Sequence, residues 1–403
     1  MKTVKFYTLG CKVNQYDTQS IREGFIQAGF KELEDSQPAQ VYLINTCTVT
    51  HKADSESLNL IRKAKRENPK ARLIVTGCLA ELDPAKIKAI GGVNCIVKSK
   101  QNWGNGISYF KAHTRAFLKI QEGCDNRCSY CRVPYARGPA RSRPLSEIIA
   151  EATRLVTNGF KEIVLCGICL GAYGKDLKSE TDLVKVIDEL QNIPGLSRIR
   201  LSSIEAGDVS EGLIDRIAGS LKLCRHLHIP MQSGDAEILK KMNRRYSPKE
   251  YLNLVQKIKS RIPGIAITTD VLVGFPGESD ENFRNTAELI KEIQPLKVHI
   301  FGYSPREGTQ AQARYGWYVD SGAIKKRITC LNDIARACSL KYREQFLNKR
   351  KEVLVEAISK YKTGFWEGRT DNYIKVLLKS NLRLKNELVK VKLKEIFGAC
   401  VLA

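Results

Sequence analysis

The sequence predicts an α/β protein of three parts: a flavodoxin-like parallel sheet, a partial (β/α)6 barrel of the TIM type, and a small C-terminal β-barrel of the oligonucleotide-binding type. Three observations predict it. A chain of 403 residues is too long for one ordinary core. Short apolar runs alternate with helical spacing over most of the chain, and near residue 341 this pattern changes to short strands and turns. We expect domains over residues 1–109, 110–340 and 341–403.

The first part is predicted to be a doubly wound parallel sheet. Strands are expected at VKFYTL, QVYLIN, ARLIVT and NCIVKS, and helices over Asn14–Ala28, Asp54–Asn68 and Pro84–Ile90. The first three strands are each followed by a cysteine, namely Cys11, Cys47 and Cys78. Because the carboxyl ends of parallel strands share one edge, where ligands bind, all three thiols are expected at that edge. Residues 99–114 lack clear periodicity and are interpreted as a linker.

The second part predicts an incomplete barrel. Six strands are expected, each followed by a helical stretch: RAFLKIQ, EIVLCG, RIRLSS, HLHIPM, AITTDVLVGF and KVHIFGYS. Six units of about thirty residues suggest a TIM-like barrel that is left open, since eight normally close one. Active-site groups should lie at the C-terminal ends of these strands. A further helix is expected over Ile324–Leu347.

The third part is basic. Residues 341–403 contain 15 Lys+Arg and 7 Asp+Glu, a net charge of +8, which fits a small β-barrel that binds RNA. Trp366, Arg369 and Tyr373 are candidates for base stacking or phosphate contact. A solvated β-domain that only caps the barrel is the alternative, and core packing is the favoured role of Tyr373.

The composition of the whole chain narrows the functional classes. The net charge of +23 favours a polyanionic partner, with nucleic acid first. A membrane surface is the rival, but no run approaches 18 apolar residues and the start lacks a signal-peptide core. We therefore expect a cytoplasmic protein without membrane association. The odd count of 13 widely scattered cysteines does not suggest a disulfide framework, so reduced thiolates that bind metal are expected.

The segment EGCDNRCSYC follows the first barrel strand and places Cys124, Cys128 and Cys131 in a C-x3-C-x2-C pattern. A structural zinc site uses four protein ligands, and no fourth ligand lies nearby. A [4Fe-4S] cube can instead be held by three thiolates with one iron left open for chemistry. The three cysteines are therefore predicted to hold such a cluster.

This pattern, with Tyr130 between the last two cysteines, resembles the radical S-adenosylmethionine superfamily. Along nearly the whole chain, the sequence resembles the methylthiotransferases. Within them it is most similar to the tRNA enzymes that act on N6-threonylcarbamoyladenosine at position 37. The resemblance is carried by FYTLGCKVNQYDT, NTCTVTHKAD, IVTGCLAE, TRAFLKIQEGCDNRCSYCRVPYARGPARSRP, LGAYGKDL, RLSSIE, HLHIPMQSGDAEILKKMNRRY, TTDVLVGFPGE and FGYSPREGTQA.

The resemblance implies two [4Fe-4S] clusters, one on Cys124, Cys128 and Cys131 and a second on Cys11, Cys47 and Cys78. It implies that one S-adenosylmethionine provides the methyl group and another the 5′-deoxyadenosyl radical, which an aromatic C–H bond requires because acid/base catalysis cannot act on it. It also implies that the C-terminal domain is a tRNA-binding TRAM module. The expected partners are the tRNA anticodon loop, an electron donor such as flavodoxin or ferredoxin, and a sulfur source, with the protein acting as a monomer.

Three alternatives stay open. Within the family these are the enzyme for isopentenyladenosine in tRNA and the one for ribosomal protein S12. From a different class, the chain could be a non-catalytic iron–sulfur protein that binds RNA.

Other candidate residues carry weaker signals. Tyr130, Ser203 and Glu205 are expected to contact S-adenosylmethionine, although a helix start explains the last two about as well. Arg137 and Arg141, in a run that also contains Arg132 and Arg143, are candidates for binding RNA or a substrate carboxylate, with a solvated charge run as the alternative. Cys166 and Cys169 are interpreted as unpaired thiols near the cofactor rather than a redox pair. His226, His228 and His299 are expected to be packed or hydrogen-bonded rather than metal ligands.

Overall fold

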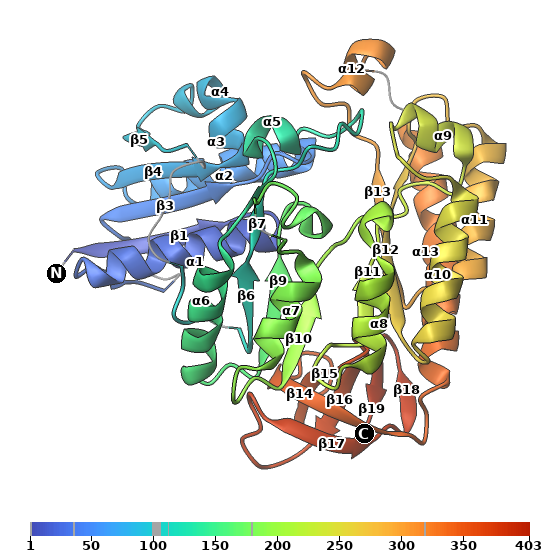
Figure 1. The fold of residues 1–403 in the computed structure, drawn as a ribbon. Helices are drawn as coiled ribbons and strands as arrows, with labels where there is room; N and C mark the ends of the chain where they lie inside the picture. The colour runs from blue at the N-terminus through green and yellow to red at the C-terminus, as the bar shows by residue number, and fades with distance from the viewer. Residues whose placement is uncertain (1, 35–36, 99–105, 112, 179, 318–319) are drawn as a thin grey trace.

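A computed structural model describes residues 2–34, 37–98, 106–111, 113–178, 180–317 and 320–403. An N-terminal sheet lies beside an open barrel, and a C-terminal sheet covers one end of that barrel (Figure 1). Of the predicted linker, residues 99–105 and 112 lie outside the described part, as do residues 318–319 before the last long helix. None of the described helices is long and apolar enough to cross a bilayer.

The N-terminal sheet is parallel throughout, as predicted, with the strand order β2-β1-β3-β4-β5. Its strands are β1 (Thr3–Thr8), β2 (Lys31–Glu32), β3 (Val41–Thr46), β4 (Arg72–Gly77) and β5 (Cys95–Ile96). Its helices are α1 (Lys12–Gln27), α2 (His51–Glu67), α3 (Cys78–Leu82) and α4 (Pro84–Lys88). The short strand β2 was not predicted. Every residue of β3 is buried, as expected for a central strand covered on both faces.

The predicted helix over Asp54–Asn68 begins earlier in the structure, at His51. The Thr50 side chain accepts a hydrogen bond from the Ala53 backbone N–H, so it satisfies one of the free donors of the first turn. Such a cap contributes about 1 kcal/mol and sets where the helix starts.

The barrel contains all six predicted strands, arranged as two parallel three-stranded sheets, β10-β9-β6 and β11-β12-β13. Parallel bridges, Ile199↔Leu223 and Ser203↔His228, join the two sheets. The strands are β6 (Arg115–Lys119), β9 (Glu162–Cys166), β10 (Arg198–Leu201), β11 (His226–His228), β12 (Ala266–Val273) and β13 (Lys297–Gly302). Strands β6 and β13 each pair on one side only, so the barrel is open between them.

Helices cover the outside of the barrel (Figure 1). They are α6 (Leu145–Thr157), α7 (Leu183–Gln191), α8 (Glu211–Gly219), α9 (Ala236–Lys241), α10 (Pro248–Arg261), α11 (Asp280–Ile293) and α13 (Ser321–Glu344). All of them except α9, whose Ile238 belongs to a smaller cluster, pack on one large apolar core. Shorter elements occupy the loops: β7 (Gln121–Glu122), α5 (Val133–Arg137), β8 (Arg141–Ser142), η1 (Leu170–Ala172), η2 (Ala206–Asp208) and α12 (Gln310–Tyr315). The helix predicted to begin at Ile324 begins at Ser321, where the Asp320 side chain caps it.

The N-terminal domain is docked against both open edges of the barrel. On one side, Val13 and Tyr16 of α1 belong to the barrel core, and the Tyr16 hydroxyl donates to Glu151 of α6 at 2.8 Å. On the other side, Arg306, which follows β13, donates to Asp54 of α2 at 2.6 Å. The carboxyl ends of the N-terminal sheet are thereby held beside those of the barrel.

The C-terminal part forms a mixed six-stranded sheet in the order β17-β14-β15-β16-β19-β18. Its strands are β14 (Arg350–Ile358), β15 (Phe365–Thr370), β16 (Lys375–Lys379), β17 (Leu388–Lys392), β18 (Glu395–Phe397) and β19 (Cys400–Leu402). The barrel end that it covers is the one where the parallel strands begin. Arg198, at the start of β10, donates to the backbone oxygens of Arg369 and Glu352 at 3.1 and 2.8 Å. The sheet therefore lies at the end of the barrel opposite the cysteine loop (Figure 1).

Candidate functional site

Cys11, Cys47 and Cys78 lie at the carboxyl ends of three neighbouring strands, as predicted. Cys11 caps α1 after β1, Cys47 follows β3, and Cys78 opens α3 after β4. Burial outweighs a backbone hydrogen bond from Val49 and, with the smaller effect of the Cys78 and Cys11 charges, raises the pKa of Cys47 to about 11. The three sulfurs are thus close enough to affect one another, and binding a cation would favour their thiolate forms.

Two glycines allow these strand ends to come together. Gly10 has a φ of +100°, and an added Cβ would lie 3.1 Å from the Cys47 Cβ. Gly77 has a φ of +94°, and its Cβ would lie 2.3 Å from the Thr46 carbonyl oxygen. A larger residue at either position would force the cysteine-bearing turns apart.

Cys124, Cys128 and Cys131 line a cavity of about 320 Å³ together with Asp125 and Asn126. A hydrogen bond from Cys169 outweighs burial and lowers the pKa of Cys124 to about 7. Burial raises the pKa of Cys131 to about 12. The loop thus presents one thiol that ionises readily and another that would ionise only against a bound cation.

Neither cysteine set, within the described residues, has the close sulfur spacing of a preformed single-metal site. A tetrahedral zinc site with Zn–S bonds of about 2.3 Å would place its sulfurs about 3.8 Å apart. Among the described residues, neither cysteine set brings three sulfurs within 4.8 Å of one another. Three thiolates are the donor set of a [4Fe-4S] cluster that keeps one iron open.

Arg137 connects the two cysteine sets, and its predicted contact with RNA is wrong. The side chain is only 2% exposed, because its guanidinium is enclosed by groups from both domains. Nε donates to the Cys78 sulfur at 3.3 Å, and Nη1 donates to Asp17 and Glu122 at 2.8 and 3.0 Å, while Nη2 donates to Asn14. A buried guanidinium with all its groups engaged is not available to a nucleic acid.

The neighbouring arginines differ. Arg132 pairs with Asp83 at 3.0 Å, and Arg143 pairs with the buried Glu151 at 2.8 Å. Arg141 is exposed on β8 and remains a candidate for RNA contact. Of the four arginines in this run, it is the one whose side chain points to solvent without a carboxylate partner among the described residues.

The structure places Glu205 in a network that sequence reasoning missed. Arg244, only 4% exposed, donates to both oxygens of Glu205 and to the Cys128 sulfur at 3.3 Å. Ser203 pairs with His228 through its backbone at the same level of the barrel. The only signal for Arg244 was its place in the quoted segment ending in MNRRY, which did not distinguish it from the neighbouring Arg245.

Three other predicted residues, Tyr130, Cys166 and Cys169, lie in or near the barrel. Tyr130 packs against Phe275, with ring centroids 6.4 Å apart, in a small apolar cluster under the cysteine loop. Cys169 lies beside the cysteine loop, where Asn126 donates to its sulfur at 3.6 Å. Cys166 is buried on β9, and burial raises its pKa. Cys169 contacts Cys124, which lines the cavity, whereas the charges nearest Cys166 are those of Lys12 and Cys11.

The candidates in the C-terminal sheet are mostly structural. Tyr373 stacks on His226 of the barrel with ring centroids 4.4 Å apart, which agrees with the favoured packing role. The Arg369 guanidinium lies 4.9 Å from the centre of the Tyr373 ring and faces the domain junction. Trp366 is partly buried against the core of the sheet.

Comparisons with known proteins agree with this arrangement. The Radical SAM superfamily matches residues 118–290, and the uncharacterized protein family UPF0004 matches residues 3–98. Threonylcarbamoyladenosine tRNA methylthiotransferase MtaB of Bacillus subtilis is 40% identical, over 98% of this chain and 94% of its own length. The protein of the same name from Thermotoga maritima is 37% identical, over 88% of this chain and 87% of its own.

A second group of relatives carries a different name. The tRNA-2-methylthio-N(6)-dimethylallyladenosine synthase of Clostridium tetani is 35% identical, over 96% of this chain and 92% of its own length. Among solved structures, the radical S-adenosylmethionine methyltransferase TsrM of Kitasatospora setae has a TM-score of 0.53 and 15% identity, and covers 76% of this chain and 77% of its own. This last likeness concerns the fold alone.

Proposed function

This chain belongs to the tRNA methylthiotransferases of the radical S-adenosylmethionine superfamily, and from that premise we propose how its residues divide the work. It is an enzyme that converts N6-threonylcarbamoyladenosine at position 37 of tRNA into the 2-methylthio form, with two [4Fe-4S] clusters and S-adenosylmethionine as cofactors. The observation that carries the proposal is the presence of two three-cysteine sets at adjoining strand ends, joined by Arg137.

Cys124, Cys128 and Cys131 would hold the cluster that binds S-adenosylmethionine, and Cys11, Cys47 and Cys78 would hold the second. When bound, these clusters supply the electron that cleaves S-adenosylmethionine and an iron that carries the sulfur to be transferred. Arg244 neutralises Glu205 and donates toward Cys128, so it would orient both beside the cofactor. Ser203 and Tyr130 would border the same cofactor.

Contacts between the two domains lie on both sides of the sites. Tyr16 with Glu151 joins the domains at one junction and Arg306 with Asp54 at the other, so these contacts would hold the two sites in a fixed relation. Because both cysteine sets come from one chain, the site is complete in a monomer. We propose that it acts as a monomer in the cytoplasm, with a flavodoxin or ferredoxin as electron donor and a separate sulfur source.

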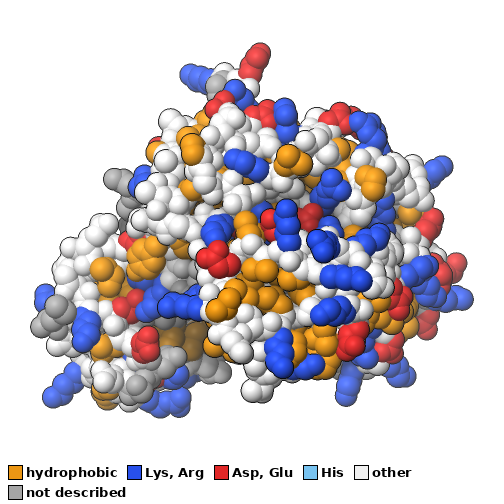
Figure 2. Space-filling model, turned by 90° about the horizontal axis from the view of Figure 1, so that it is seen from below, with side chains coloured by type: hydrophobic (Ala, Val, Ile, Leu, Met, Phe, Trp, Pro, Cys, Tyr) orange, Lys and Arg blue, Asp and Glu red, His pale blue; other side chains and the backbone are white. Residues whose placement is uncertain are grey.

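We propose domain boundaries at residues 1–109, 110–340 and 341–403, with the last domain acting as a TRAM-type tRNA-binding β-barrel. Lys and Arg side chains are spread over this end of the molecule, with hydrophobic side chains between them (Figure 2). The exposed basic residues of this domain include Lys349, Arg350, Lys360, Lys379, Arg383, Lys385, Lys390, Lys392 and Lys394. Exposed Tyr361 and Phe397 lie among them, which suits a surface that binds phosphates and stacks bases.

The RNA-binding role is tested with a Lys390→Ser, Lys392→Ser double variant on the edge strand β17. Each lost phosphate contact should reduce the slope of log affinity against log salt by about 0.7, so the pair should reduce it by about 1.4. Affinity is measured for tRNA by fluorescence anisotropy at several salt concentrations. An unchanged slope would place the tRNA on another face.

The reaction is tested by mass spectrometry of tRNA nucleosides from cells with and without this protein. The 2-methylthio-N6-threonylcarbamoyladenosine signal should disappear without it. If the 2-methylthio form of isopentenyladenosine disappears instead, the substrate belongs to the other branch of the family. If both remain and the purified protein does not cleave S-adenosylmethionine, a non-catalytic RNA-binding role is correct.

A further inference from the structure

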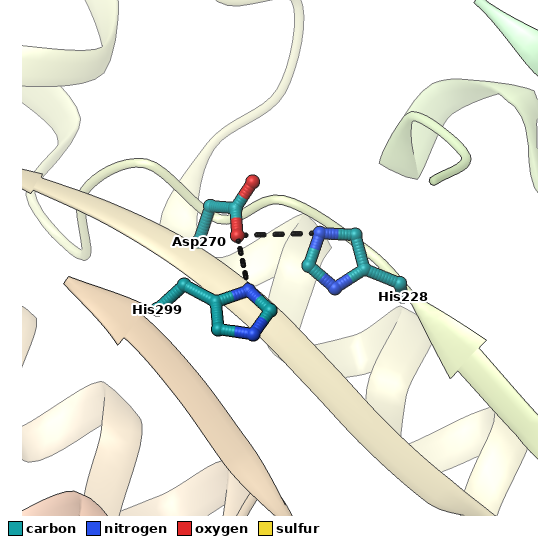
Figure 3. A group of neighbouring side chains, drawn as sticks. All are labelled: His228, Asp270 and His299. Atoms are coloured by element: carbon teal, nitrogen blue, oxygen red, sulfur yellow. Dashed lines mark hydrogen bonds and ion pairs between the residues drawn. The ribbon is translucent and has the colours of Figure 1, made fainter. Parts of the chain in front are cut away.

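Three polar side chains form a group inside the barrel that the proposed function does not use. The Asp270 carboxylate on β12 lies between the imidazoles of His228 on β11 and His299 on β13 (Figure 3). Its Oδ1 accepts from His299 Nδ1 at 3.0 Å and lies 3.3 Å from His228 Nε2. Burial acts to raise the pKa of Asp270, but the hydrogen bonds from the two histidines outweigh it and lower the pKa, so the carboxylate is ionised.

Strand alternation shows that this group faces the interior of the barrel. Val271 and Val273 of β12 and Val298 of β13 belong to the apolar core under the outer helices. Neighbouring residues on a strand point to opposite faces, so Asp270 and His299 point inward. The same argument applies to His228, because Leu227 and Ile229 lie in that outer core.

The group also lies at the level of the predicted cofactor site. The backbone of His228 pairs with that of Ser203, the residue proposed to border S-adenosylmethionine. The barrel end below is filled by the stacked rings of Tyr373 and His226. A substrate that reaches the cofactor from the open side would therefore meet the inner face of β12 and β13.

The two histidines differ in whether a ring nitrogen is left without a partner among the described residues. His228 uses both ring nitrogens, since its Nδ1 lies 2.9 Å from the Thr268 hydroxyl and its Nε2 faces Asp270. His299 uses Nδ1 on Asp270, and within the described residues its Nε2 has no partner. The His299 side chain is 38% exposed, so Nε2 is open to a ligand.

An exposed aromatic ring lies beside His299. Phe301 is two residues further along β13, hence on the same inner face, and is 45% exposed. In register it pairs with Leu272, as His299 pairs with Asp270. An exposed phenylalanine inside a barrel offers a flat apolar surface on which a purine can stack.

We propose that the inner face of β13 selects the substrate: Phe301 stacks on the adenine to be modified, and His299, oriented by Asp270, binds the carboxylate of the threonylcarbamoyl group. This inference rests on the proposed function and names the residues that choose between its two branches. Asp270 is a positioning residue, since it keeps a proton on Nδ1 and turns Nε2 toward the ligand. In its doubly protonated form the ring donates from Nδ1 to Asp270 and from Nε2 to the incoming carboxylate.

The chemistry of this pair favours an anionic substituent over a hydrocarbon one. A dimethylallyl group has neither a donor nor an acceptor, so it would leave the polar His299–Asp270 pair desolvated and unmatched. Sites built to hydrogen-bond a substrate group discriminate strongly against analogues that lack it. A threonyl carboxylate instead provides a charged acceptor for a charge-assisted hydrogen bond.

The test uses anaerobic, cluster-loaded full-length enzyme and two anticodon stem-loop RNAs. One carries N6-threonylcarbamoyladenosine and the other its threonine methyl ester, which lacks the negative charge. Binding is measured by fluorescence anisotropy. The wild-type protein should prefer the acid by roughly 10- to 100-fold, as expected for one hydrogen bond to a charged group.

His299→Phe should abolish this preference while binding of the ester stays unchanged, which also shows that the variant is folded. Asp270→Asn should weaken the preference partly. Phe301→Ala should weaken acid and ester equally, by roughly 5- to 100-fold, as expected for a lost stacking contact. Lys297→Met, a lysine on the same face of β13, is the control and should leave the preference intact.

Two results would overturn the proposal. One is a His299→Phe variant that still prefers the acid. The other is one equivalent of zinc or another metal beyond the cluster iron that is lost in His299→Phe, since the trio would then be a metal site. The binding preference is an equilibrium property, so it can fail while the wild-type enzyme still methylthiolates tRNA. Conversely, an intact preference without methylthiolation would overturn the proposed function and leave this site standing.

Discussion

The two cysteine sites hold the same number of thiols but are built in different ways. Cys124, Cys128 and Cys131 come from a single loop after β6, so the chain between them determines their spacing. Cys11, Cys47 and Cys78 come from three strands, so the register of the N-terminal sheet determines theirs. A local site depends on its loop and the side chains around it. A site assembled from distant residues depends on the fold of a whole domain.

The largest expected effect comes from breaking the local site. Cys128→Ala should abolish formation of 5′-deoxyadenosine from S-adenosylmethionine, because two thiolates do not retain the cube. Iron should fall from about eight to about four per chain, since three thiolates hold each four-iron cluster. Product is measured by chromatography of the reduced enzyme, with the exposed Cys330→Ala as control. Continued cleavage at the wild-type rate would refute the assignment of this loop.

Breaking the dispersed site should separate the two activities. Cys47→Ala should also reduce iron to about four per chain, but S-adenosylmethionine cleavage should persist while methylthiolation of tRNA is lost. Both products are measured in the same reaction by mass spectrometry. Cys95→Ala, a thiol on β5 of the same sheet, is the matched control. If Cys47→Ala retained about eight irons, these three cysteines would be ordinary strand-end thiols.

A variant of Arg137 tests how much the junction between the two domains stabilises the protein. Arg137→Met removes a buried cation that contacts Asp17 and Glu122, so both carboxylates lose a partner. Removing one member of a buried ion network typically costs 3–5 kcal/mol, and we expect about 3 kcal/mol because Lys119 still pairs with both acids.

Stability is followed by anaerobic denaturant unfolding. Arg141→Met, at the exposed arginine of the same segment, should leave the unfolding free energy unchanged. An Arg137 variant as stable as the wild type would show that the domains do not rely on this junction.

The smallest effect is expected from Arg244, which acts on the local site only. Arg244→Lys keeps the charge but cannot span Glu205 and Cys128 with one planar fork. Loss of a side chain that orients metal ligands commonly costs 10- to 100-fold in activity, and we expect roughly the lower end for cleavage of S-adenosylmethionine. The second cluster should be unaffected, as judged by the iron content. A fall in iron to about four would show that Arg244 is needed to retain the local cluster.

Much of the fold followed from pattern alone. The parallel N-terminal sheet, the six barrel strands and a C-terminal region of short β-strands were predicted, because alternation of apolar runs and turns is a local property. The closed C-terminal β-barrel stays a prediction. Helix starts were less accurate: α2 begins at His51 because the Thr50 hydroxyl caps it, a contact that hydrophobic periodicity does not encode. Strand β2, with two residues, is too short to leave a periodic signal.

Side-chain partners were harder to predict than backbone elements. Arg137 lies in a basic run and suggested a surface contact, yet its guanidinium is buried between two domains. Arg244 reaches Cys128 across 116 positions of sequence, and no local pattern indicates such a contact. The sequence alone does not tell which face of β13 points into the barrel. The pairing of β13 with its neighbours places His299 and Phe301 on the inner face.

By itself, the sequence determined the chemistry of this protein. Three thiols in a C-x3-C-x2-C loop and a strong positive charge indicate a metal cluster and a polyanionic partner, because ligand type and short-range spacing are written in the chain. The second cluster, on Cys11, Cys47 and Cys78, was implied by the resemblance to the methylthiotransferases. Only the tertiary structure decided how the two sites face each other, which charges are buried between them and which face of the barrel is left open. These features depend on contacts between residues far apart in sequence, and packing rather than local preference selects them.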